Sequence, residues 1–158
     1  MKDETFAEYL PYIRRAADRA QQAFQRIPRG DTESFFFDSA ALNLHRFYNG
    51  VEQLLERIAK ELDDTVPTGS AWHRQLLEQM KLEIPSVRPA VIRSATRTAL
   101  DKYLGFRHVV RNLYTWDFDV PQVMRLIDQL PQTLANLEQD LKRFCNFLDA
   151  AGHADEKQ

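Results

Sequence analysis

Residues 123–148, "VMRLIDQLPQTLANLEQDLKRFCNFL", decide the fold class because they carry the most regular apolar pattern in the chain. The apolar positions follow one another at alternating steps of four and three: Val123, Ile127, Leu130, Leu134, Leu137, Leu141, Phe144 and Leu148. Steps of this size place an apolar stripe along one side of an α-helix. Pro131 lies inside the pattern and is expected to kink the helix or to open a turn.

The same periodicity appears near the start of the chain, over residues 6–27. Pro11 interrupts it, and proline is favourable only in the first turn of a helix. The first helix therefore either begins near residues 9–10, with Pro11 in its first turn, or has two preceding turns that form a kinked lead-in.

Three further helices are predicted between these two. A stripe over 44–62 predicts a helix that begins near 31–34 and ends near Asp63. Ser70 is a suitable N-cap for a short helix through "AWHRQLLEQMKLE". The next helix is expected to begin near Pro89 and to end near Trp116.

No segment shows sustained two-residue alternation, and the short cluster "SFFFDS" leads directly into a helical pattern. The sequence therefore predicts an all-α fold, an antiparallel bundle of four long helices plus one short helix. We expect a single domain over 1–152. The polar segment 153–158 follows Gly152 and is expected to be a flexible tail.

The composition excludes several classes of protein. The formal net charge is −2, so the chain as a whole is not expected to attract nucleic acid, and RNA binding would need a local basic patch. No apolar run is long enough for a transmembrane helix, and residues 1–10 lack the order of a signal peptide. A single cysteine excludes an internal disulfide. These features predict a cytoplasmic protein without membrane association.

No metal or cofactor site is expected from the sequence. Four scattered histidines and one cysteine argue against zinc, and no histidine follows a glutamate at the spacing of di-iron bundles. Cys145 lies on the apolar side of the last predicted helix, which indicates a core residue rather than a nucleophile. His45 and His73 are interpreted as structural, although His73, within "WHR", could contact a site indirectly.

Residues 105–118, "GFRHVVRNLYTWDF", concentrate polar groups in the middle of a predicted core helix. The polar groups are two arginines, a histidine, an amide and a phenol: Arg107, Arg111, His108, Asn112 and Tyr114. At about 100° per residue, the arginines and the tyrosine fall within an arc of roughly 60°. The histidine and the asparagine form a neighbouring stripe. The helix therefore combines an apolar face with a broad polar face.

Two interpretations of this face remain open from the residues alone. Arg107 and Arg111 could pair with acids on neighbouring helices. Alternatively, two guanidiniums on one face could hold a phosphate by bidentate contacts, beside a histidine that can move a proton near neutral pH. The second arrangement suits metal-free cleavage of RNA, in which a 2′-hydroxyl is deprotonated and a dianionic transition state is stabilised.

The stretch "GFRHVVRNLYTW", together with "SAWHRQLLEQM" and "RPAVI", resembles the HepT-like group of the HEPN superfamily, from about Leu44 to Leu148. The resemblance implies a HEPN-like helical domain that is a metal-independent endoribonuclease toxin of a type VII toxin–antitoxin module. It also implies a site assembled across a homodimer or higher homo-oligomer. The implied antitoxin is a minimal nucleotidyltransferase that can transfer AMP to a tyrosine of the toxin.

The family motif is Arg-x4-His-x-Tyr, and the chain departs from it at one position. Arg107 matches the arginine and Tyr114 the tyrosine, whereas Asn112 occupies the histidine position and cannot act as a general base. The resemblance therefore implies that Arg107 stabilises the scissile phosphate, with His108 as the candidate acid or base. Arg111 and Asn112 would orient RNA, and Tyr114 would contact RNA and accept AMP.

Two rival hypotheses follow from the same stretch. In one, the protein is a catalytically inactive HEPN binding module that binds a nucleotide or the nucleotidyltransferase, and Asn112 marks the lost activity. In the other, the chain is a plain helical bundle whose arginines form salt bridges.

Overall fold

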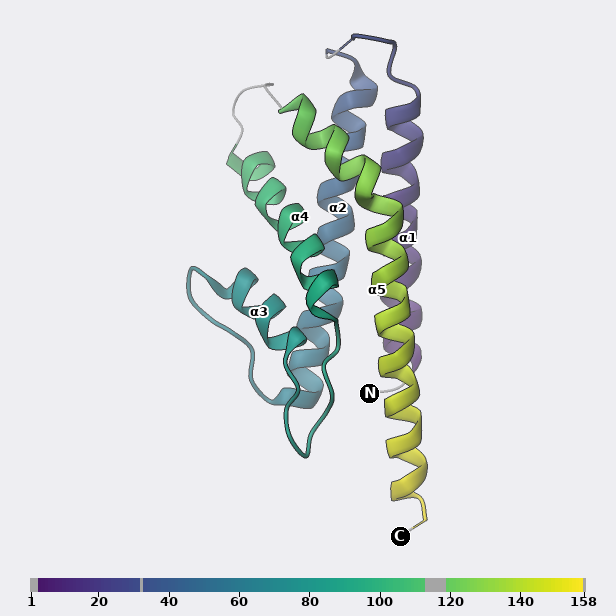
Figure 1. Ribbon diagram of the computed structural model, residues 1–158, viewed down its shortest axis with the longest axis vertical. Helices are drawn as coiled ribbons and strands as arrows, with labels where there is room; N and C mark the ends of the chain where they lie inside the picture. Colours follow the sequence, from purple (N-terminus) through teal and green to yellow (C-terminus); the bar gives the residue numbers. More distant parts are fainter. Residues whose placement is uncertain (1–2, 32, 113–118, 158) are drawn as a thin grey trace.

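The computed structural model describes residues 3–31, 33–112 and 119–157, with Asp3 and 108–112 described by their backbone only. Over these residues all regular secondary structure is helical and there is no strand, which confirms the all-α part of the prediction. The elements are α1 (Asp3–Gln25), α2 (Phe35–Ile58), the π-helical turn η1 (Ala59–Asp63), α3 (Trp72–Lys81), α4 (Ser94–Asn112) and α5 (Val120–Asp155) (Figure 1).

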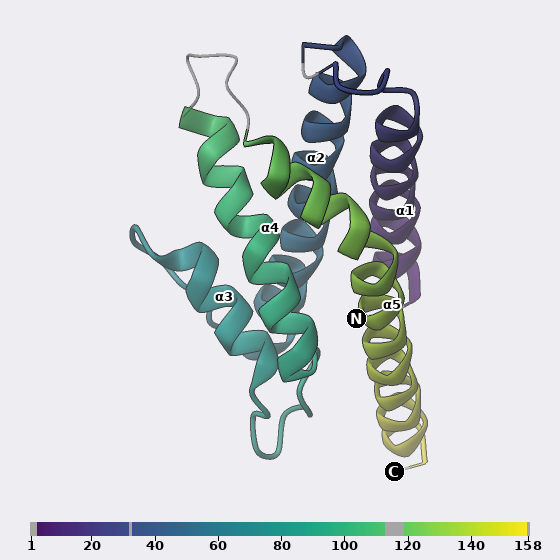
Figure 2. The same cartoon turned by 45° about the horizontal axis from the view of Figure 1, so that its top comes forward.

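Helices α1 and α2 lie side by side along most of their lengths (Figures 1 and 2). Gly50 permits this close approach, because a Cβ atom there would lie 2.9 Å from the side chains of both Ile13 and Tyr12. Helix α1 begins at Asp3 and contains Pro11 in its interior. The alternative in which the helix begins near residues 9–10 is therefore wrong, and the first two turns precede the proline.

Helix α2 begins and ends close to the predicted positions. The Ser34 side chain accepts a hydrogen bond from the Phe36 amide at 3.2 Å and caps the helix. The helix continues without interruption into η1, which ends at Asp63. Asp64 then adopts a left-handed conformation with φ of 53°, which turns the chain away from the helical path.

Helix α4 begins at Ser94 and not near Pro89 as predicted. The reason is that the intervening backbone is engaged by other elements. The amides of Val91 and Ile92 donate to the Met80 carbonyl at the end of α3, at 2.9 and 3.2 Å. These amides hold a bend of the chain against α3, and the helix begins only after they are satisfied.

The start of α3 also differs from the prediction. Its N-cap is Ala71, which makes no side-chain capping bond, so the expected cap at Ser70 is wrong. The helix is held instead by tertiary contacts: Leu76, Leu77 and Met80 are buried in the core.

Helix α5 is the longest element, and the Asp119 side chain accepts from the Gln122 amide at its start. Pro131 lies inside it without ending it. The ribbon changes direction within the first half of the helix (Figure 2), as expected when proline removes a backbone hydrogen bond. The helix extends to Asp155 and so includes the first residues of segment 153–158, whose flexibility stays a prediction.

Buried contacts between α2, α4 and α5 fix the position of α4. The rings of Phe47 and Tyr103 meet edge to face at 5.3 Å, and the Tyr103 hydroxyl donates to the Leu126 carbonyl at 2.7 Å. At the start of α4, the buried Asp140 carboxylate accepts from the Thr96 hydroxyl at 2.5 Å and from the Arg93 amide at 3.0 Å. These contacts position the part of α4 that carries Arg107.

Candidate functional site

Arg107 extends from α4 toward α2 and α3 and meets a polar cluster between the helices. Its Nη1 lies 2.9 Å from Oε1 of Glu52, on α2, and 2.8 Å from Nδ1 of His73, on α3. The Arg107 side chain is 16% exposed and that of Glu52 only 6%. The cluster therefore joins three helices at a point where the Arg107 side chain is still partly exposed.

The Glu52 carboxylate bridges the other two members of the cluster. Its Oε2 lies 2.7 Å from Nδ1 of His73, while Oε1 accepts from Arg107. Nδ1 cannot donate to Glu52 and accept from Arg107 at the same time, because it carries either a proton or a lone pair. With Glu52 ionised, Nδ1–H of His73 donates to the carboxylate. Nη1 of Arg107 then lies close to Nδ1 because both groups donate to the same carboxylate, and not because they form a hydrogen bond with each other.

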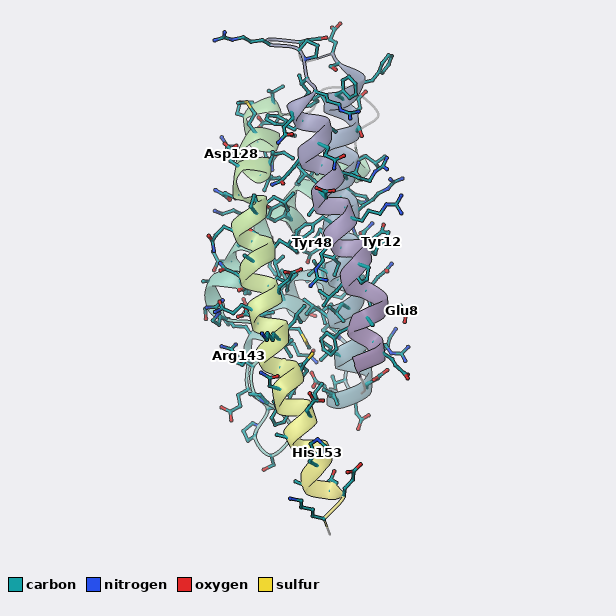
Figure 3. All side chains as sticks on the ribbon, turned by 90° about the vertical axis from the view of Figure 1, so that its right-hand side faces the viewer. Glu8, Tyr12, Tyr48, Asp128, Arg143 and His153 are labelled. Carbon is teal, nitrogen blue, oxygen red and sulfur yellow. The ribbon has the colours of Figure 1, made fainter. Side chains whose placement is uncertain are left out.

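Tyr48 lies one helical turn before Glu52 on α2 and is buried in the interior of the fold (Figure 3). Burial, then the negative charge of Glu52, raises the pKa of the Tyr48 phenol far above its usual value. A hydrogen bond to Glu52 acts in the same direction. Tyr48 thus stays protonated at neutral pH and supplies a further donor to the buried carboxylate.

The Trp72 ring lies against the imidazole of His73, with ring centroids 3.7 Å apart, and restrains the imidazole from its own helix. Arg74 donates to Asp101 of α4 at 3.3 Å, but this ion pair is exposed and lies outside the cluster. An exposed pair of this kind contributes little to the position of the imidazole.

The arrangement leaves the guanidinium of Arg107 only partly satisfied. All of its contacts with other described residues are made by Nη1, and Nε is buried without a hydrogen-bond partner there. A guanidinium carries five N–H donors in a planar fork. Because Nε is buried, Nη2 is the nitrogen that can meet an anionic ligand. Chemically, the site can orient one arginine toward a phosphate.

The prediction that a motif arginine pairs with an acid of a neighbouring helix is confirmed for Arg107, whose partner is Glu52. The backbone of α4 carries Arg107, His108, Arg111 and Asn112 on one helix. The side chains of the last three, and all of Tyr114, lie outside the described residues. Their predicted roles stay predictions.

The sequence interpretation missed Glu52 and judged His73 correctly as a residue with structural contacts that reach the site. The only signal for Glu52 was a single acid within the apolar stripe of α2, beside Val51 and Leu54. Cys145 is half-buried and packs against the core, as expected. On α2, His45 is half-buried, and its Nε2 lies 3.1 Å from Nδ2 of Asn49.

Two further searches of the described residues gave negative results. No group of three or more His, Cys, Asp or Glu side chains among them is placed to hold a metal ion. No helix within the described ranges is long and apolar enough to cross a membrane.

The fold and the site together define a small helical protein with an arginine-centred polar cluster at the junction of three helices. Comparison with protein families identifies this class: the model of the family described as "HepT-like protein" matches residues 39–148, well over half of the chain. The chain belongs to the HepT-like family, and such membership fits a HEPN-type toxin of a toxin–antitoxin pair. Searches of curated proteins and of solved structures found no match.

Proposed function

We propose that this HepT-like protein is a metal-independent endoribonuclease toxin that acts in the cytoplasm as a homodimer on a four-helix antiparallel scaffold. The observation that carries the proposal is the state of Arg107. Its guanidinium is anchored by Glu52 through Nη1, and its Nη2 makes no hydrogen bond to another described residue and can meet a phosphate. The family match spans the whole cluster, since Glu52, His73 and Arg107 all lie within 39–148.

The proposed reaction is cleavage of an RNA phosphodiester by its own 2′-hydroxyl. A base removes the 2′-hydroxyl proton, the oxygen attacks phosphorus, and the bond from phosphorus to the 5′-oxygen breaks as that oxygen takes up a proton. The products are a 2′,3′-cyclic phosphate and a 5′-hydroxyl end. Arg107 stabilises the extra negative charge on the phosphate in the transition state.

Two histidines are candidates for the proton transfer, since Asn112 cannot serve. His108 follows Arg107 directly in the sequence and is the acid or base in this proposal, while Arg111 and Asn112 orient RNA. His73 contacts Arg107, but it is largely buried and its Nδ1 is engaged with Glu52. We therefore assign His73 and Glu52 to positioning the guanidinium.

The proposal also includes regulation by a partner. A cognate minimal nucleotidyltransferase would neutralise the toxin by transferring AMP to Tyr114. A homodimer would bring two Arg107 sites together, which concentrates positive charge on a chain whose net charge is −2.

One observation favours a second candidate function, a catalytically inactive module that binds a nucleotide or the nucleotidyltransferase. Arg107 is only 16% exposed and already pairs with Glu52, and Asn112 replaces the motif histidine. In such a module, the cluster of Glu52, His73 and Arg107 would stabilise the fold and form part of the surface that binds the partner.

The deciding experiment is RNA cleavage in EDTA by purified protein whose Tyr114 is shown by mass spectrometry to carry no AMP. We expect wild-type protein to produce 2′,3′-cyclic phosphate ends and Arg107→Ala to lose about 10²-fold or more in rate. His108→Ala should lose activity as well. Arg74→Ala is the matched control, because it removes an arginine from an exposed ion pair beside the cluster.

Each outcome selects one function. Absence of cleavage of total RNA by unmodified wild-type protein would reject the ribonuclease and favour the binding module. Equal rates for wild type and Arg107→Ala would reject the role of Arg107. Retention of activity in His108→Ala would reject His108 as the acid or base, whereas loss of activity in His73→Gln is expected from its positioning role.

A further inference from the structure

A second basic surface lies far from the Arg107 cluster in the sequence, in the groove between α1 and α2. A hollow of about 410 Å³ is lined by arginines from both helices together with Tyr12, Ala16 and Asn43. A neighbouring hollow of about 260 Å³ is lined by further arginines together with Gln22, Ala23, Phe36 and Ser39. The arginines of the two hollows are Arg15, Arg19, Arg26 and Arg46, and Arg19 belongs to both. The two hollows therefore form one continuous track, called here the α1–α2 groove.

The groove carries positive charge that is not neutralised within the described part of the chain. None of its four arginines forms an ion pair with another described residue, and no carboxylate from these residues lines either hollow. By contrast, Arg14 on α1 pairs with Glu138 and Arg57 on α2 pairs with Glu61. Unpaired arginines gathered in a groove form an anion-binding surface, even on a chain of negative net charge.

Asn43 adds an independent sign of a ligand. It is only 2% exposed, and its Nδ2 donates to the Ser39 carbonyl at 2.8 Å, which fixes the orientation of the amide. Its Oδ1 is buried and has no hydrogen-bond partner among the described residues. A buried acceptor without a partner lowers the stability of the fold by about 1–3 kcal/mol. A ligand that donates an N–H or O–H hydrogen bond to this oxygen would remove that cost. Three exposed arginines, Arg15, Arg19 and Arg46, line the same hollow as Asn43.

The two requirements together define the chemistry of the occupant. The arginines require anionic groups, whereas the Asn43 oxygen requires a donor, which a phosphate diester lacks. A ribonucleotide chain has both groups, since each phosphate is followed by a ribose with a 2′-hydroxyl. An acidic peptide also combines negative charges with backbone N–H donors, so the choice between the two occupants rests on the aromatic rings of the groove.

Exposed aromatic rings at the groove support the same occupant. Tyr12 in the first hollow is 47% exposed and Phe36 in the second is 41% exposed. Figure 3 shows Tyr12 on the side of α1 that faces away from α5. Aromatic side chains beside a basic track are the platforms on which bases of single strands stack.

We propose that the α1–α2 groove binds single-stranded RNA, separately from the Arg107 site. The arginines contact successive phosphates over a track of about 16 Å along α1, given a rise of 1.5 Å per residue between Arg15 and Arg26. Asn43 accepts from a ribose 2′-hydroxyl, and Tyr12 and Phe36 stack on bases. All of α1 precedes residue 39, where the family match begins, so the α1 side of the groove lies outside the matched residues.

The test is binding of a fluorescent single-stranded RNA 15-mer, measured by anisotropy in EDTA. All proteins carry Arg107→Ala, so that neither cleavage nor its absence affects the result. We expect the triple substitution Arg15→Ala, Arg19→Ala and Arg46→Ala to weaken binding tenfold or more. It should also lower the slope of log K against log salt by about 2, since each phosphate contact on a single strand contributes about 0.7.

The matched control removes the same number of arginines from exposed ion pairs: Arg14→Ala, Arg57→Ala and Arg74→Ala. It should bind RNA like the parent protein. Because all six arginines are exposed, thermal melting should show that both triple variants are folded. Equal affinity of the two triple variants would overturn the groove as an RNA site, whatever the outcome for cleavage.

A further arm tests the ribose contact. The parent should bind RNA more tightly than DNA of the same sequence, and Asn43→Ala should reduce that preference. Equal binding of RNA and DNA by the parent would overturn the assignment of a 2′-hydroxyl to Asn43. Competition by polyglutamate as effective as that by unlabelled RNA would overturn the choice of nucleic acid.

Discussion

Arg88 and Arg107 each pair with a buried carboxylate, and they differ in how many of their own N–H groups form hydrogen bonds. Arg88 donates to Asp63 through Nε at 2.6 Å and through Nη2 at 2.7 Å, and to three backbone carbonyls as well. Its side chain is fully buried. Arg107 makes all of its contacts with the described residues through Nη1, and its side chain is partly exposed.

The difference separates a structural arginine from a functional one. Every nitrogen of the Arg88 guanidinium donates a hydrogen bond within the protein. These bonds hold the segment between α3 and α4 in place, and no donor of Arg88 remains for a ligand. Arg107 is oriented by Glu52 but keeps free donor capacity within the described surroundings. Pairing with an acid therefore does not by itself make an arginine structural, and the number of donors in use is the better criterion.

The largest effect expected from this comparison is on stability. Arg88→Ala should lower the free energy of unfolding by about 3–5 kcal/mol, because it leaves the buried Asp63 charge without its partner. Arg107→Ala should lower it by about 1–3 kcal/mol, because Glu52 keeps its hydrogen bonds with His73 and Tyr48. Urea unfolding of the two variants measures the difference.

A control for this prediction is the double variant Arg88→Met with Asp63→Leu, which removes both charges and should recover much of the loss. If Arg107→Ala were as destabilising as Arg88→Ala, the Arg107 pair would be structural too. The helical-bundle hypothesis would then account for the cluster.

A smaller effect, mainly on activity, is expected when the anchor of Arg107 is changed. Glu52→Gln keeps the size of the side chain but removes the charge that holds the guanidinium. RNA cleavage should fall about tenfold or more, chiefly in kcat, because a misplaced Arg107 stabilises the transition state less. Binding of RNA to the α1–α2 groove should not change.

Asp101→Asn is the matched control for Glu52→Gln, since Asp101 pairs with the exposed Arg74 on the adjoining face of α3. It should leave cleavage close to the wild-type rate. A Glu52→Gln variant with wild-type kcat would show that the carboxylate does not position Arg107 for catalysis.

The sequence predicted the helices because the apolar stripes have a period that only a helix satisfies. It did not predict the start of α4, because Val91 and Ile92 are committed to the Met80 carbonyl, a contact between segments that no local pattern reveals. Helix boundaries depend on such tertiary hydrogen bonds, whereas helix existence depends on local periodicity.

The candidate site was predicted in part for the same reason. Arg107 was visible from its motif, but Glu52 is one acid in an apolar stripe, and a sequence does not distinguish a buried acid from a solvated one. Asn43 was invisible in the same way, since its importance lies in an oxygen that is buried and unpaired. Partners from three separate helices become apparent only when the helices are packed.

The smallest effect concerns Tyr48, and it shows whether the phenol supports the Glu52 carboxylate. Tyr48→Phe removes one hydrogen bond to that carboxylate and should cost about 1 kcal/mol of stability at pH 7. The decline in the free energy of unfolding at alkaline pH provides the second measurement. Burial and the nearby Glu52 raise the Tyr48 pKa above its usual value of 10.0, so the folded state disfavours the phenolate.

Stability from this source is complete below pH 10 and declines as the pH rises above it, because the unfolded chain then releases a proton that the folded chain retains. Tyr48→Phe should therefore lose less stability than wild type between pH 10 and pH 11 in urea unfolding. Tyr103→Phe provides the comparison, since burial raises the pKa of Tyr103 to about 12 without a carboxylate among the causes. Stability at alkaline pH that is unchanged by Tyr48→Phe but declines less in Tyr103→Phe would show that the folded state does not raise the Tyr48 pKa, and would reject the burial of this phenol beside the Glu52 carboxylate.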